Sequence, residues 1–119
     1  MKTKINFDKD MHESYMGMTI PEHTQVTLSY YLIQGYEPGG FVTSMLAMDM
    51  ERALATADTA NRQRMWAIGR WIVENAPCGS FGSYQAVQDW IADKDGRRTR
   101  YAKEAEQEYI MQTLKDGVE

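Results

Sequence analysis

The sequence has 119 residues, a length that fits one domain, and its 43% apolar residues and three tryptophans suffice for a hydrophobic core. A net charge of −4 argues against a general nucleic-acid binder, and the single cysteine, Cys78, excludes an intrachain disulfide and a cysteine-based zinc site. No apolar run approaches the roughly 18 residues that span a bilayer, and the first residues lack the apolar stretch of a signal peptide. We therefore expect a cytosolic protein without a membrane partner.

Residues 1–18 have no clear hydrophobic period. Charged residues surround isolated apolar ones such as Ile5 and Phe7. We expect an extended N-terminal arm that becomes ordered only where it docks on the body or on a partner. Residues 19–119 are expected to form a single helical domain.

The first helix is predicted to begin at the sequence TIPE. Thr19 fits an N-cap and Glu22 completes a capping box, with Pro21 in the first turn. Apolar residues then recur at helical spacing up to Gly35, which fits a glycine that ends a helix.

A second helix is predicted over 39–57, after the turn sequence EPGG. Its apolar residues, including Met45, Met50 and Leu54, form a stripe that we assign to the core. Asp58 is predicted to cap a third helix over 59–75. In that helix Gly69 indicates the close approach of another helix, because a mid-helix glycine costs about 1 kcal/mol relative to alanine.

Two more helices complete the expected fold. Pro77 ends the third helix, and the loop CGSFGS leads to a short helix that Ser83 caps and Gly96 follows. The last helix, 98–115, is highly charged. Its apolar residues form a thin seam that fits the rim of the body or a neighbouring subunit: Tyr101, Ala105, Tyr109, Ile110 and Leu114. The fold class is therefore all-α, a compact bundle of about five helices, and a small domain of this kind often self-associates.

The residues that could carry catalysis are few. His12 and His23 do not have the spacing of a zinc-binding helix, and a bound cofactor or metal is not expected. Cys78 lies before a predicted helix, where a thiolate is favoured, but a lone cysteine is more often inert. We predict that the protein is not an enzyme.

Anion binding is a second possibility, because glycine-led helix starts expose backbone N–H groups to a ligand. Three groups are the candidate binding residues for a partner or an anion: Gly39, Gly40 and Phe41; Ser80, Gly82, Ser83 and Tyr84; and Arg97, Arg98 and Arg100. Positive charge at a helix start opposes the helix dipole, so the arginines hint at an anionic partner. The structural alternatives are a helix corner that places Phe41 in the core and a solvated arginine face.

The third predicted helix is not expected to bind DNA in a sequence-specific way. Its arginines alternate with Trp66, Ile68, Trp71 and Ile72, so it is too apolar to lie in a major groove.

The motifs IPEHT (20–24), GYEPGGF (35–41), ADTAN (57–61) and GSYQAVQDW (82–90) resemble a family of small accessory proteins encoded by tailed bacteriophages. The similarity covers about three-fifths of the chain and implies a phage origin and the cytoplasm of an infected bacterium. The resemblance implies no catalytic residues for this chain.

This resemblance implies a non-enzymatic, anti-defence role. The protein is expected to bind and inhibit a bacterial defence or host protein, with exposed aromatic residues and the last helix as its binding surface. The alternative is an oligomeric binder that sequesters a phosphorylated, cyclic nucleotide signal with its glycine loops and arginines.

Overall fold

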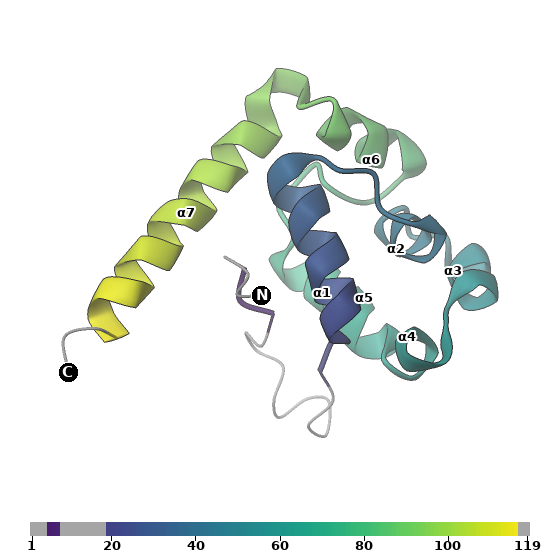
Figure 1. The fold of residues 1–119 in the computed structure, drawn as a ribbon. Helices are drawn as coiled ribbons and strands as arrows, with labels where there is room; N and C mark the ends of the chain where they lie inside the picture. The colour runs from purple at the N-terminus through teal and green to yellow at the C-terminus, as the bar shows by residue number, and fades with distance from the viewer. Residues whose placement is uncertain (1–4, 8–18, 117–119) are drawn as a thin grey trace.

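The computed structural model describes residues 5–7 and 19–116, and within them every regular element is a helix (Figure 1). The predicted all-α fold is confirmed, but these residues form seven α-helices where about five were expected. Their bounds are α1 (Glu22–Ser29), α2 (Gly40–Leu46), α3 (Met50–Thr56), α4 (Thr59–Gln63), α5 (Met65–Asn75), α6 (Tyr84–Ile91) and α7 (Arg97–Asp116). A π-helix, Tyr30–Gln34, extends α1, and a 3₁₀ turn, Lys94–Gly96, precedes α7.

The start of α1 differs from the prediction. Pro21, in an extended conformation, is the N-cap, and its carbonyl accepts the amides of Thr24 and Gln25 at 2.9 and 3.0 Å. No side chain caps the helix, so the predicted capping box of Thr19 is wrong. At the other end Gly35 has the left-handed φ of 72° that was expected of a terminating glycine.

The predicted helix 39–57 is broken in two at Met48. This residue takes a left-handed φ of 63°, and Asp49 then caps α3 by accepting the Arg52 amide at 3.2 Å. The predicted helix 59–75 is also broken, at Arg64, into α4 and α5. Asp58 caps α4 as expected, through the Asn61 amide at 2.8 Å.

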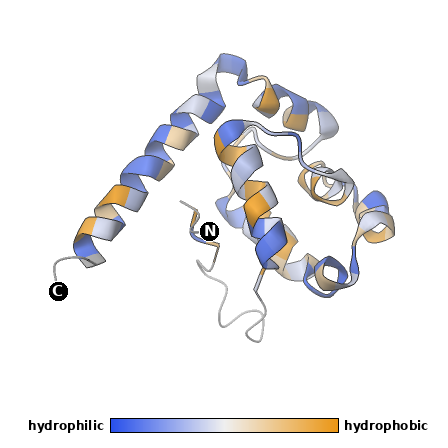
Figure 2. Cartoon of the chain, in the orientation of Figure 1, coloured by the Kyte–Doolittle hydropathy of each residue, from blue (hydrophilic) through white to orange (hydrophobic). Residues whose placement is uncertain are grey.

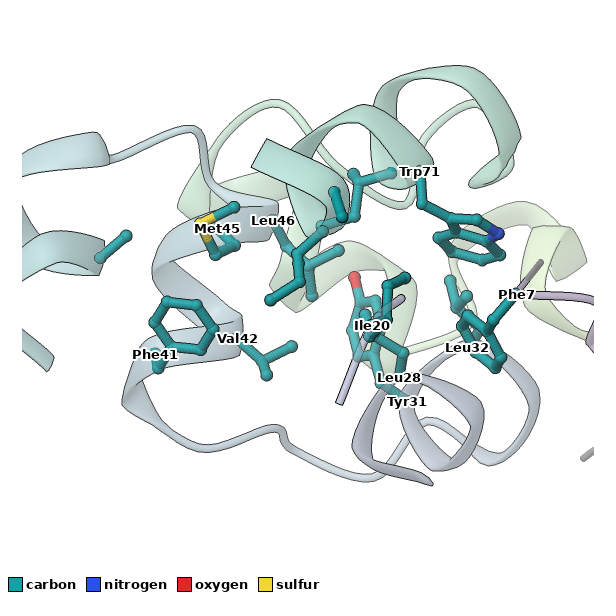
Figure 3. Packing of buried hydrophobic residues seen from close by; sticks show 14 of the residues in the cluster. Phe7, Ile20, Leu28, Tyr31, Leu32, Phe41, Val42, Met45, Leu46 and Trp71 are labelled. Carbon is teal, nitrogen blue, oxygen red and sulfur yellow. The ribbon is translucent and has the colours of Figure 1, made fainter. Parts of the chain in front are cut away.

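The buried core joins helices that are far apart in sequence (Figure 3). Its largest fully buried side chains are those of Trp71, Trp90 and Tyr31. The Phe7 ring packs at a tilt against Trp71 with 4.6 Å between ring centroids, and the Trp71 indole N–H donates to the Asn6 carbonyl at 3.2 Å. Residues 5–7 of the predicted arm are thus packed on the body; the rest of 1–18, apart from these three, lies outside the described residues.

Helix α7 runs away from the body, on the side opposite α3 and α4 (Figure 1). Tyr101 and Ala105 in its first half pack on the body, as the predicted seam requires. Ile110 and Leu114 belong to the same predicted seam but are exposed. In Figure 2 the apolar colour on α7 is concentrated towards its C-terminal end.

Candidate functional site

The glycines of EPGGF begin α2 in open space. A Cβ on Gly39 would meet nothing within 4 Å, and one on Gly40 would meet only the Arg52 Nη2 atom, at 3.8 Å. Both positions therefore have room for a Cβ, so close packing against another backbone does not explain these glycines. Phe41 is buried in the core, which agrees with its predicted place at a helix corner.

The loop GSFGS holds the fold together through its buried groups. The Ser80 carbonyl accepts the Tyr31 hydroxyl at 2.7 Å, and the Ser80 side chain is fully buried. The Gly82 amide donates to the Leu46 carbonyl at 2.7 Å, and its φ of 118° favours glycine. The loop therefore supplies a hydrogen-bond donor to the carbonyl of the last residue of α2.

Ser83 and Tyr84 are both engaged in local contacts. Ser83 caps α6 by accepting the Ala86 amide at 3.0 Å, as predicted. The Tyr84 hydroxyl donates to the Asp49 carboxylate at 2.5 Å, and the Arg52 guanidinium lies 5.7 Å from the Tyr84 ring centroid. These contacts fasten the start of α6 to the start of α3.

The two glycine loops do not form one cradle. Gly40 begins α2, whereas Gly82 contacts its last residue, about 10 Å away along a seven-residue helix. The Arg52 side chain lies near residues of both groups: its Nη2 atom is 3.8 Å from a Cβ placed on Gly40, and its Nη1 donates to the Tyr84 hydroxyl at 3.4 Å.

Of the three arginines, the structure brings together Arg97 and Arg100, which line one hollow, and places Arg98 apart from them. Arg97 forms an ion pair with Asp95 at 3.9 Å, and Arg100 donates to the Asp95 carbonyl at 3.4 Å. Arg98 turns inward, where its guanidinium donates to the carbonyls of Trp90 (3.2 Å), Ile91 (3.4 Å) and Ile33 (3.4 Å).

Arg98 therefore neutralises carbonyls at the C-terminal ends of α6 and of the π-helix, where a cation is favoured. The guanidinium of Arg98 is thus hydrogen-bonded to backbone carbonyls of the fold itself. A nucleotide site made from the three arginines and the glycine loops stays a prediction.

Sequence reasoning missed an apolar groove on the surface of the described residues. A groove of about 550 Å³ lies between α2 and α3 on one side and α4 and α5 on the other. We call it the Met groove, because its apolar lining is Met45, Met48, Met50, Leu54, Met65, Trp66, Gly69 and Val73.

The floor of the Met groove is formed where α5 crosses α2. A Cβ on Gly69 would lie 3.4 Å from the Met45 Cε atom, so the expected close approach at this glycine is made by a methionine side chain. Because Gly69 has no side chain, α5 does not cover the Met45 methyl group, and both residues line the groove.

The walls are exposed apolar side chains. Met48, Met50, Leu54, Trp66 and Val73 are each between 45% and 69% exposed. The sequence analysis assigned Met50 and Leu54 to the core, and this assignment is wrong. The helix breaks at Met48, so α3 does not continue the helical period of α2 and these two side chains are exposed. An apolar surface gathered in one concave place marks an interaction site far more than scattered exposed residues do.

The charged residues of the Met groove have partners within the fold: Arg70 forms an ion pair with Glu74 at 2.5 Å, and Arg62 donates to the Ala57 carbonyl at 3.3 Å. Arg62 and Arg70 line it, and the one carboxylate in its lining belongs to Asp49. The Asp49 carboxylate accepts the Tyr84 hydroxyl and the Arg52 amide, and these contacts lower its pKa, the Tyr84 bond most. Since Glu74 pairs with Arg70, the charges at the groove balance and its apolar side chains are its distinctive feature.

Two other carboxyl groups have a lowered pKa. The Asn61 amide has the largest effect on the pKa of Asp58, which also accepts a contact from His23 at 3.1 Å. The Thr99 hydroxyl and amide lower the pKa of Asp93. Both carboxylates accept a backbone amide in the first turn of a helix, Asp58 in α4 and Asp93 in α7.

Cys78 is exposed and lines a separate hollow of about 380 Å³ together with Arg97 and Arg100. Within residues 5–7 and 19–116, His, Cys, Asp and Glu side chains form no group of three that could hold a metal ion. None of the helices in that part of the chain has both the length and the apolarity of a membrane span.

Comparison of the chain with protein-family models, with curated proteins and with solved structures found no match in any of the three. The resemblance to phage accessory proteins therefore stays a prediction that rests on the short motifs alone.

Proposed function

We propose that this protein is a non-enzymatic binder that holds an apolar helical segment of another protein in the Met groove. The observation that carries the proposal is the groove itself, in which exposed apolar side chains from separate helices line one hollow of about 550 Å³. An amphipathic helix laid in an apolar groove is a common mode of protein recognition.

The composition of the groove suits this role. Methionine is unbranched and polarisable, so it adapts its shape to a partner at little cost. Trp66, which is 69% exposed, offers the large flat surface that often dominates the binding energy of an interface. A partner helix that inserts apolar side chains between Trp66 and Leu54 would contact both walls.

We further propose that the partner is a bacterial host or defence protein, which the chain inhibits by stoichiometric binding in the cytoplasm of an infected cell. The sequence resemblance to phage accessory proteins supports this part.

A matched pair of variants tests the role of the groove. Leu54→Glu places a carboxylate in the groove wall, while Ala55→Glu places the same charge on the next residue of α3, which is also exposed but lies outside the groove. Tagged wild-type protein and both variants are purified from infected bacteria, and the co-purifying proteins are identified by mass spectrometry.

We expect one host protein to accompany the wild type and Ala55→Glu in a fixed ratio, and to be lost from Leu54→Glu. Equal recovery with both variants would place the binding surface elsewhere. A small nucleotide released by denaturation of the purified protein, with no protein partner, would favour the sequestration alternative.

A further inference from the structure

Residues 5–7, which we call the strap, pack on α5 through Trp71. The Ile5 and Phe7 side chains are 8% and 3% exposed, so the body covers both almost completely. The Phe7 ring packs on the Trp71 ring, and the Trp71 indole N–H donates to the carbonyl of Asn6, the residue between them. The three residues belong to no helix or strand, so tertiary contacts of this kind hold the strap in place.

The strap and the Met groove lie on opposite faces of α5. At about 100° per residue, Trp71 lies about 200° around the helix axis from Gly69. Gly69 lines the groove and faces the Met45 methyl group. Figure 3 accordingly shows Phe7 beside Trp71 at one end of the packed cluster and Met45 at the other end. Helix α5 is therefore held between the strap on one face and the groove floor on the other.

The strap is a small unit compared with the body. The burial of two apolar side chains must offset the entropy that is lost when three residues become ordered, and these opposing terms are of similar size. Trp90, by contrast, lies within the body: its ring meets that of Tyr101 at 6.0 Å, and its indole N–H donates to the Leu32 carbonyl at 3.3 Å. Segments that bury few side chains open more often than the core does.

We propose that the strap opens from Trp71 while the body stays folded, and that the docked strap holds α5 in the position that shapes the Met groove. When the strap leaves, the Trp71 face of α5 becomes accessible, and α5 loses part of the packing that holds it against Met45. Resting on the function proposed above, this coupling has a regulatory consequence. A target in the groove favours the docked strap, and the docked strap favours the target, because linkage between two sites is reciprocal.

Hydrogen exchange of the two buried indole N–H groups tests the opening of the strap in the wild-type protein. Each group donates to a backbone carbonyl, Trp71 to the strap and Trp90 to the body, so Trp90 is the internal control. The rates are measured by NMR at several urea concentrations below the unfolding transition. We expect Trp71 to exchange at least about tenfold faster than Trp90, with little dependence on urea, because opening of the strap exposes little surface.

A Trp71 indole that exchanges no faster than that of Trp90, or with the same dependence on urea, would overturn the proposal. The strap would then belong to the same cooperative unit as the core. Since this measurement needs no substitution, it does not depend on whether a variant folds.

Two variants, studied without any target, test the effect of the strap on the groove. Phe7→Ala removes the ring that packs on Trp71. Tyr101→Ala is the control, because it removes another ring from the core, at the contact of α7 with Trp90. Circular dichroism first shows that both variants keep their helix content, and Phe7→Leu takes the place of Phe7→Ala if the latter does not fold.

Methyl NMR of methionine-labelled protein then reports on the groove. We expect Phe7→Ala to shift the methyl signals of Met45 and Met65, which line the groove, and to leave that of Met111 on α7 in place. Tyr101→Ala should leave Met45 and Met65 in place. Unmoved groove signals in Phe7→Ala, or equal shifts in Tyr101→Ala, would overturn the coupling between strap and groove. Because the target plays no part in these measurements, their failure would leave the proposed function to its own test.

Discussion

Replacing Arg98 by methionine should destabilise the fold much more than the same change at Arg97. Arg98→Met keeps an unbranched apolar stem but leaves the carbonyls of Ile33, Trp90 and Ile91 without their charged donor. A hydrogen bond to a charged group contributes roughly 1.5–3 kcal/mol when buried. These three bonds are 3.2–3.4 Å long and half-buried, so we assign about 1 kcal/mol to each. We therefore expect the free energy of unfolding to fall by about 2–3 kcal/mol.

Urea unfolding followed by circular dichroism measures this loss. With a slope of about 1.5–2 kcal/mol per molar, the midpoint should fall by roughly 1–2 M while the slope itself is unchanged. Arg97→Met is the matched control: its exposed ion pair with Asp95 at 3.9 Å should contribute less than about 0.5 kcal/mol. Equal effects of the two substitutions would refute the assignment of Arg98 to the ends of α6 and the π-helix.

Three further changes test other parts of the fold. Gly40→Ala should leave the free energy of unfolding unchanged or slightly higher, since a Cβ there meets only Arg52 at 3.8 Å; a loss above about 1 kcal/mol, measured by urea unfolding, would contradict this. Gly35→Ala should lower thermal stability by about 2–3 kcal/mol, because φ is 72° and the new Cβ would lie 2.6 Å from the Arg98 Nε atom; an unchanged melting temperature would contradict the close contact. Burial raises the pKa of Tyr101 to about 12, with smaller contributions from the negative charges of Glu108 and Glu104. The folded state therefore keeps a proton that the unfolded state loses above pH ~10. Stability should then fall between about pH 10 and 12 by up to about 1.4 kcal/mol per unit, and Tyr101→Phe should reduce this slope in unfolding curves recorded at each pH; an unaltered slope would contradict it.

The sequence predicts those parts of the fold that depend on local chemistry. Asp58 and Ser83 cap their helices through amides three residues ahead, Gly35 ends a helix in a left-handed conformation, and α5 ends before Pro77. Each of these features is decided by the residue itself and its immediate neighbours.

The breaks at Met48 and Arg64 could not be predicted in the same way. Neither position has glycine or proline, and a left-handed methionine costs about 1–2 kcal/mol that tertiary packing must offset. The only local signal is Asp49, which can cap a helix but also occurs within one.

The Met groove was missed because of the Met48 break. An uninterrupted helical period places Met50 and Leu54 on the buried stripe, whereas the reversal at Met48 turns them to the surface. The predicted glycine and arginine sites depended on convergence in space, which sequence spacing does not determine. Arg98, for example, is drawn inward by carbonyls that lie as far away in sequence as Ile33.

The central claim is that the Met groove binds a helical segment of another protein. Methyl NMR of methionine-labelled protein tests it most directly, because Met45, Met48, Met50 and Met65 all line the groove. On titration with the partner recovered from infected cells, these four methyl signals should shift together in wild-type protein and in Ala55→Glu, and stay in place in Leu54→Glu. Binding of the partner with all four signals unchanged would contradict the account.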